Sequence, residues 1–205
     1  MYRSVIFDMD GTLADTCEGI FHAYQYTMEQ MGKHFLGAAF VRKAIGAPLT
    51  EVFRKTCGMN ESETTEAIKH YRNYYRSKGW NEIRIYPGIE TVLKTLHKQG
   101  YLLGIATLKK EEFAFSILEK ANLLSYFDAV CGANREDRLT KADLIRICMK
   151  KLGTDPANTV LIGDSEYDAA GAEEVGAAFL AVTYGFGFQQ QSALEKWQVK
   201  MVAHH

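Results

Sequence analysis

Hydrophobic residues in this chain fall into short runs that alternate with longer segments of helical periodicity. Each run is apolar at almost every position, which is typical of a strand covered on both faces of a sheet. In the intervening segments apolar residues recur three and four positions apart, which predicts helices. The predicted strands are the run beginning at Val5 and residues 101–107, 127–132, 159–164 and 178–184, and the predicted helices are residues 89–99, 110–121, 140–152 and 166–176.

This alternation predicts the fold class. Strands separated by helices favour right-handed βαβ units, in which a parallel sheet carries helices on both faces. We therefore expect an α/β fold with a doubly wound, Rossmann-like parallel sheet.

One long segment departs from this alternation. From residue 16 to residue 82 the pattern is helical and contains no convincing strand, and strand and helix alternate only after Tyr86-Pro87-Gly88. We expect an α/β core domain from residues 1–15 and 83–205 and an inserted α-helical cap domain from residues 16–82. Gly46-Ala47-Pro48 breaks the helical pattern and predicts a loop between cap helices. Beyond about residue 189 the pattern is less informative.

Composition narrows the function classes. The 205 residues are 47% hydrophobic, and the formal net charge of −1 does not indicate binding to nucleic acid or to an anionic membrane. The four cysteines are widely scattered, which suggests neither a disulfide framework nor a zinc site. The N-terminus lacks the pattern of a secretory signal, and no run approaches membrane-spanning length. We expect a cytoplasmic monomer or homodimer that binds a small ligand.

The end of the first strand raises a chemical question. The buried run Val5-Ile6-Phe7 stops at Asp8 and Asp10, followed by Gly11 and Thr12. Two carboxylates that close disfavour each other's ionisation. Either a cation compensates them, or the chemistry needs one protonated and one ionised carboxyl group.

Further polar residues follow other predicted strands. In doubly wound sheets ligands bind outside the carboxyl ends of the strands. The residues there are Asp8, Asp10, Thr107, Lys141, Asp164 and Asp168. Clustered carboxylates suit a hard divalent cation such as Mg²⁺, and a hydroxyl and an ammonium group suit the oxygens of a tetrahedral anion. Phosphate is the natural candidate.

These residues carry a resemblance to a known family. Four motifs occur in order: D-x-D-G-T at residues 8–12, an apolar strand ending at Thr107, a lone Lys141, and G-D-x-x-x-D at residues 163–168. The chain resembles the haloacid dehalogenase superfamily, in the branch of phosphoglycolate phosphatases and β-phosphoglucomutases that have a helical cap after the first strand.

The resemblance implies a Mg²⁺-dependent phosphatase acting on a small phosphorylated metabolite. Asp8 would form an aspartyl-phosphate, and Asp10 would act as general acid and base. Thr107 and Lys141 would bind the phosphoryl oxygens. The implied metal site draws on Asp8, the backbone carbonyl of Asp10, and Asp164, while Asp168 would orient Lys141 or a metal-bound water.

The insert is expected to select the substrate, because it follows the catalytic loop directly. Arg42, Lys43 and Arg54 flank the Gly46-Ala47-Pro48 loop and are our candidates for binding an anionic group of the substrate. Gly185-Phe186-Gly187 is expected to form a loop at the rim without chemistry of its own.

Other functions stay open at this point. A phospho-receiver uses similar residues, but its phosphorylated aspartate follows a later strand. A dehalogenase lacks an acid at the position of Asp10. Sugar phosphomutases often have Glu-Asp where Gly163-Asp164 stands here. Phosphonoacetaldehyde hydrolysis needs a cap lysine, for which Lys33 and Lys43 are available.

Overall fold

A computed structural model describes residues 2–134, 139–188 and 191–204. The chain forms two compact units, one made of residues 1–15 and 85–205 and the other of residues 16–84. Two short paired strands, β2 (Ala14–Asp15) and β3 (Arg84–Ile85), lie where the chain passes from one unit to the other. That these units are a core domain and a cap domain remains a prediction.

The first unit is built on a parallel sheet, which confirms the predicted fold class. Its strands run in the order β5-β4-β1-β6-β7-β8. Their bounds are β1 (Ser4–Phe7), β4 (Leu102–Lys110), β5 (Ala129–Ala133), β6 (Thr159–Gly163), β7 (Ala178–Val182) and β8 (Val199–Ala203). In the centre, Phe7 of β1 pairs with Ile105 of β4 and with Ile162 of β6. The strand that ends at Asp8 is thus an interior strand.

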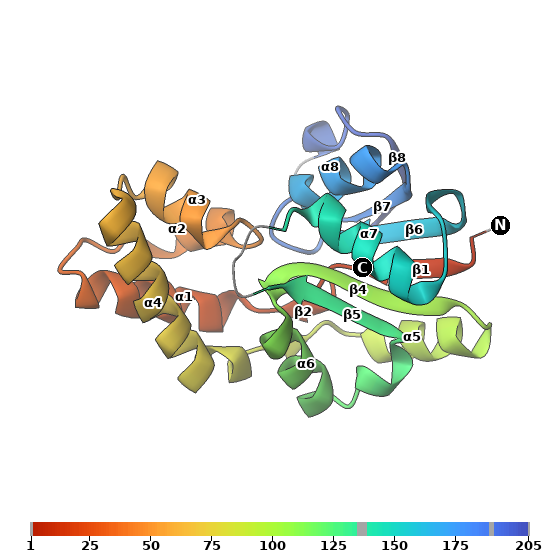
Figure 1. Ribbon diagram of the computed structural model, residues 1–205, viewed down its shortest axis with the longest axis horizontal. Helices are drawn as coiled ribbons and strands as arrows, with labels where there is room; N and C mark the ends of the chain where they lie inside the picture. The colour runs from red at the N-terminus through yellow and green to blue at the C-terminus, as the bar shows by residue number, and fades with distance from the viewer. Residues whose placement is uncertain (1, 135–138, 189–190, 205) are drawn as a thin grey trace. The chain divides into compact units, whose positions relative to one another are not determined.

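Helices cover both faces of this sheet. They are α5 (Ile89–Lys98), α6 (Glu111–Lys120), α7 (Lys141–Leu152) and α8 (Glu166–Val175), with short 3₁₀ turns at η3 (Leu124–Tyr126), η4 (Pro156–Asn158) and η5 (Gln191–Ala193). Helices α7 and α8 lie on one face, and α5 and α6 lie on the other (Figure 1). All four residues of β1 are therefore buried, which explains its continuous apolar run.

The starts of α7 and α8 are fixed by side chains. Helix α7 begins with a capping box: the Thr140 hydroxyl accepts from the backbone N–H of Asp143, whose carboxylate accepts from the N–H of Thr140. Helix α8 begins with a second box made by Ser165 and Asp168. These caps determine which residues of each first turn lie beside the strand ends.

The second unit is helical, as expected. It contains α1 (Cys17–Gln30), α2 (Gly37–Ala44), α3 (Leu49–Glu51), a π-helical turn η1 (Val52–Thr56), α4 (Glu61–Ser77) and a 3₁₀ turn η2 (Gly79–Asn81). Aromatic rings form its centre, where the Tyr24 ring lies 4.9 Å from Tyr71 and 5.5 Å from Phe53. The predicted loop at Gly46-Ala47-Pro48 lies between α2 and α3.

Two strands differ from the expectation. Strand β4 continues to Lys110, three residues past the predicted end, and its pairing with β5 shifts register between Thr107 and Lys110. Strand β8 lies in the segment that the pattern left unassigned. It lies at the edge of the sheet beside β7, its residues are half-buried or exposed, and it follows a 3₁₀ turn, so the strand–helix alternation does not reach it.

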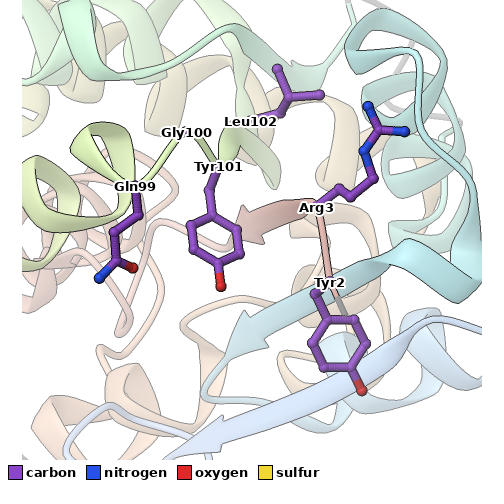
Figure 2. A pocket seen from close by; sticks show the side chains of 6 residues that line it. All are labelled: Tyr2, Arg3, Gln99, Gly100, Tyr101 and Leu102. Carbon is purple, nitrogen blue, oxygen red and sulfur yellow. The ribbon is translucent and has the colours of Figure 1, made fainter.

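A hollow of about 430 Å³ lies at the opposite end of the central strands from the acidic residues. Figure 2 shows it at the amino ends of β1 and β4, with Tyr2 and Arg3 on one side and Gln99, Gly100, Tyr101 and Leu102 on the other. Because it lies at the amino ends of the strands, it is separate from the predicted site. Of the helices in the described ranges, none has the length and apolar content needed to cross a membrane.

Candidate active site

The six residues of the first unit that the sequence selects for chemistry lie just after two strands, within a third strand, or in the first turns of two helices. They are Asp8 and Asp10 after β1, Thr107 in β4, Asp164 after β6, Lys141 in α7 and Asp168 in α8. All six are buried. Buried charges are costly unless they are paired, so their mutual contacts determine what the site can do.

Lys141 joins two of the carboxylates. Its ammonium group donates to Oδ1 of Asp8 at 2.5 Å and to the carbonyl of Ala106 at 2.7 Å, and it forms an ion pair with Oδ1 of Asp168 at 2.8 Å. Burial by itself lowers the pKa of Lys141, but the carboxylates of Asp168 and Asp8 outweigh it and raise that pKa above its ordinary value. Lys141 is therefore a permanent cation beside Asp8.

The Asp8 carboxyl group is strongly perturbed. Its pKa is raised to about 8, mainly by burial; the Lys141 ammonium opposes the rise, and the nearby acids Asp168, Asp164 and Asp10 add to it. Without another cation, proton binding at Asp8 is thus favoured up to neutral pH. A buried carboxyl group perturbed in this way is a feature of functional sites.

Asp164 is held by backbone amides. Its Oδ2 accepts from the N–H groups of Phe186 at 2.7 Å and Gly187 at 3.1 Å. Burial and the Asp168 charge raise the pKa of Asp164 to about 7, against the lowering effect of these two hydrogen bonds. The loop after β7 thus fixes the orientation of this carboxylate.

The Gly185-Phe186-Gly187 loop, for which no chemistry of its own was expected, therefore has a structural role in holding Asp164. A Cβ at Gly185 would collide with the Gly11 carbonyl and the Asp164 carboxylate. Gly11 has a φ of +83° and faces the same carboxylate. Two glycines thus let two backbone segments approach Asp164. The Gly-x-Gly pattern directly after the predicted strand at residues 178–184 was the feature of the sequence that could have indicated this close approach.

Asp168 uses both of its oxygens within the protein. Oδ2 accepts from the Ser165 hydroxyl at 2.6 Å and from its backbone N–H at 3.0 Å, while Oδ1 faces Lys141. The helix cap and the ammonium group therefore share one carboxylate. Of the two roles that the resemblance implies for Asp168, this arrangement favours orienting Lys141 over orienting a metal-bound water.

Asp10 has a cationic partner that the sequence did not indicate. The ammonium group of Lys109 lies 3.0 Å from Oδ1 of Asp10, and both side chains are nearly inaccessible, at 5% and 10% exposure. Lys109 was missed because the strand was predicted to end at Thr107. In the structure, the Thr107 hydroxyl accepts from the backbone N–H of Lys109 at 3.2 Å.

The donors fit a hard divalent cation. Asp8, Asp164 and Asp168 each offer an oxygen, and these atoms lie within 4.8 Å of one another. In the described part of the chain, the four carboxylates face two ammonium groups, those of Lys141 and Lys109. When all four are ionised, two negative charges remain, which a divalent cation bound by carboxylate oxygens balances.

The three cap candidates belong to the second unit. Arg42 and Lys43 occupy the last turn of α2, Arg54 lies in η1, and all three are exposed. The hydrogen bonds and ion pairs described above for the six buried residues do not involve them, so their role in substrate binding stays a prediction.

Comparison with known proteins places this arrangement in a family. The family described as haloacid dehalogenase-like hydrolase matches residues 5–182. A 5'-nucleotidase from Pseudomonas aeruginosa is 34% identical over 93% of this chain and 86% of its own, and the probable phosphatase IndB from Dickeya dadantii is 32% identical over 95% and 87%.

A solved structure extends the likeness to three dimensions. The crystal structure of a predicted phosphatase from Clostridium acetobutylicum superposes with a TM-score of 0.93 at 35% identity, covering 100% of this chain and 94% of that one. The sequence match includes the strands that carry the buried carboxylates. The chain therefore belongs to the haloacid dehalogenase-like hydrolase family.

Proposed function

We propose that this enzyme is a Mg²⁺-dependent phosphatase that hydrolyses a small phosphomonoester through an aspartyl-phosphate on Asp8. The observation that carries the proposal is the buried cluster of Asp8, Lys141, Asp168 and Asp164 at the carboxyl edge of the sheet. The phosphatase names of its relatives support the same reaction class.

Asp8 is the nucleophile in this proposal. Lys141 holds Oδ1, and we assign the attack on phosphorus to Oδ2. The bond between phosphorus and the leaving oxygen breaks as the bond to Asp8 forms. Attack requires the ionised carboxylate, and Lys141 favours that form against the effect of burial.

Asp10 carries the proton in both steps. It donates a proton to the leaving alcohol when the aspartyl-phosphate forms, and it accepts one from the water that then attacks phosphorus. The second attack breaks the bond between phosphorus and Asp8 and releases inorganic phosphate. One carboxyl group thus serves as acid and then as base.

The remaining residues are assigned to binding the metal ion and the phosphoryl group. A bound Mg²⁺ would be held by Asp8, Asp164 and the backbone carbonyl of Asp10, and it would supply electrostatic stabilisation of the transferring phosphoryl oxygens. Lys141 and the Thr107 hydroxyl are assigned to the other phosphoryl oxygens. Asp168 keeps Lys141 in place.

The substrate is proposed to be a small phosphorylated metabolite, and the enzyme is proposed to act in the cytoplasm as a monomer or homodimer, without nucleic acid or membrane. All four cysteines are free, which agrees with a reducing compartment. Arg42, Lys43 and Arg54 of the helical unit are proposed to recognise an anionic group of the metabolite.

Activity measurements with defined phosphate esters test the proposal. We expect p-nitrophenyl phosphate hydrolysis that requires Mg²⁺, stops with EDTA and is absent from the Asp8→Asn protein. A panel of phosphoglycolate, nucleoside monophosphates, sugar phosphates and phosphonoacetaldehyde then ranks the substrates. Metal-independent turnover would contradict the mechanism, and isomerisation of glucose 1-phosphate faster than any hydrolysis would identify a mutase.

A further inference from the structure

The contact between Lys109 and Asp10 has no role in the mechanism above. The side chain of Lys109 is only 5% exposed, and its Nζ lies 3.0 Å from Oδ1 of Asp10. Burying an ammonium group next to a carboxylate is favourable only when the geometry is well defined. The surroundings of Lys109 show that its backbone is held in place.

The irregular end of β4 sets the position of Lys109. The register of β4 against β5 shifts between Thr107 and Lys110, and the Thr107 hydroxyl accepts from the N–H of Lys109. On the β5 side, a Cβ at Gly132 would lie 2.8 Å from the Lys109 carbonyl and 2.5 Å from Cα of Glu111. Only a glycine at position 132 allows this close packing.

Lys110 anchors the same segment from the other side. Its ammonium group donates to the carbonyl of Asn134, just after β5. The irregular end of β4 is thus held at two points, by close packing against Gly132 of β5 and by the hydrogen bond from Lys110 to the carbonyl of Asn134. With its own backbone held in this way, Lys109 places its ammonium group next to Asp10 rather than in solvent.

We propose that Lys109 is a positioning residue that acts through Asp10. Resting on the proposed function, this inference adds a residue to the proton-transfer step. An aspartate side chain rotates about two bonds, and the ion pair at Oδ1 restricts that rotation. Oδ2 is then left for the proton that passes to the leaving alcohol and from the attacking water.

A double-mutant cycle separates this role from two others. Lys109→Met keeps most of the length of the side chain but removes its charge. If Lys109 acts through Asp10, the substitution lowers kcat for p-nitrophenyl phosphate by about 10- to 100-fold in the wild-type background. It then has little further effect in the Asp10→Asn background, because the group that it positions is already disabled.

Controls address folding and general charge effects. Lys94 is exposed and lies on α5, a helix that carries none of the six site residues, so Lys94→Met serves as the matched control and is expected to retain wild-type kcat. Lys109→Arg keeps the positive charge and should recover part of the loss. If Lys109→Met melts well below the wild type, the same cycle is run with Lys109→Arg, whose partial loss should likewise vanish in the Asp10→Asn background.

The outcomes are distinguishable. Wild-type protein without Mg²⁺-dependent phosphomonoesterase activity overturns the proposed function and this inference with it. If the wild-type protein is active and the losses caused by the Lys109 and Asp10 substitutions multiply, only the inference is overturned. A multiplied loss that appears mainly in KM indicates that Lys109 binds the substrate directly. A multiplied loss in kcat that parallels a loss of thermal stability indicates a structural role for Lys109. A loss that disappears in the Asp10→Asn background supports the proposal.

Discussion

Asp8 and Lys141 lie 133 positions apart in the sequence, and their side chains form a buried ion pair of 2.5 Å. One follows the central strand β1, and the other begins helix α7. The parallel sheet brings them together because both lie at its carboxyl edge.

Replacing Lys141 by methionine tests this pair. The substitution removes the cation that opposes the raised pKa of Asp8, so less of the nucleophile is ionised, and it leaves the buried carboxylates of Asp8 and Asp168 without their shared cationic partner. We expect a lower kcat for every ester and a loss of about 3–5 kcal/mol in the free energy of unfolding. Urea denaturation and steady-state kinetics measure both. A variant that keeps its activity with all esters would argue against a role in phosphoryl binding.

The two aspartates of the first motif should differ in a trapping experiment. Asp8→Asn lacks the nucleophile and should form no phosphoenzyme. Asp10→Asn keeps the nucleophile but loses the acid and base, which typically costs about 10²- to 10⁴-fold. With p-nitrophenyl phosphate, whose leaving group needs little protonation, attack should outrun hydrolysis of the intermediate. Intact-mass spectrometry after a rapid quench should therefore find phosphate on Asp8, and a phosphate on any other residue would refute these roles.

Gly185→Ala should weaken metal binding. The added methyl group would collide with the Asp164 carboxylate and displace it from its two backbone donors. We expect a lower affinity for Mg²⁺ in calorimetric titration, with a smaller effect on the phosphate ester KM at saturating metal. Phe186→Leu is the matched control because it retains the backbone N–H. Equal Mg²⁺ affinity in Gly185→Ala and wild type would show that the loop does not support a metal ligand.

Metal-free protein should become less stable as the pH rises from about 4 to about 8. The pKa values of Asp8 and Asp164 are raised to about 8 and about 7, so across this window the folded protein retains protons that the unfolded chain has released. Its free energy of unfolding then falls with rising pH. Bound Mg²⁺ replaces those protons, and its stabilising effect should be larger at pH 8 than at pH 5.

Thermal denaturation in EDTA and in saturating Mg²⁺ measures this dependence. Asp164→Asn should flatten the decline in EDTA, since it removes one of the two titrating groups. A melting temperature in EDTA that rises steadily between pH 5 and pH 8 would contradict the assignment.

The exposed cap residues should affect substrate choice. For Arg42→Ala, Lys43→Ala and Arg54→Ala we expect kcat/KM to fall more for esters with a second anionic group, such as phosphoglycolate, than for p-nitrophenyl phosphate. The ratio of the two kcat/KM values is the measurement. An equal loss for both substrates would remove these residues from substrate recognition.

The fold and most of the core site were predictable from the sequence because they follow from patterns among residues that are near one another in the chain. Strands buried on both faces are continuously apolar, and Asp8, Thr107 and Asp164 each follow such a run. Thr140 and Asp143 have the spacing of a capping box, which is a local pattern that puts Lys141 in the first turn of a helix.

The residues that were missed depend on non-local geometry. Lys109 faces Asp10 because β4 continues through an irregular register against β5, and a strand length of this kind is set by the neighbouring strand. The amides of Phe186 and Gly187 act through the backbone, so their side chains gave no chemical signal. Strand β8 is an edge strand that follows a 3₁₀ turn, so the alternation of strands and helices did not indicate it.

The two capping boxes of α7 and α8 have a consequence for mutational tolerance. Both have the same local form, but the Asp143 side chain is 40% exposed and contacts groups of its own helix and cap, whereas Asp168 is fully buried and also contacts Lys141. In a saturation-mutagenesis library selected for activity, position 143 should accept Glu, Ser or Asn, while position 168 should accept almost nothing. Substitutions at the start of α7 should therefore be tolerated during evolution. Substitutions at the start of α8 change the position of the ammonium group that contacts Asp8.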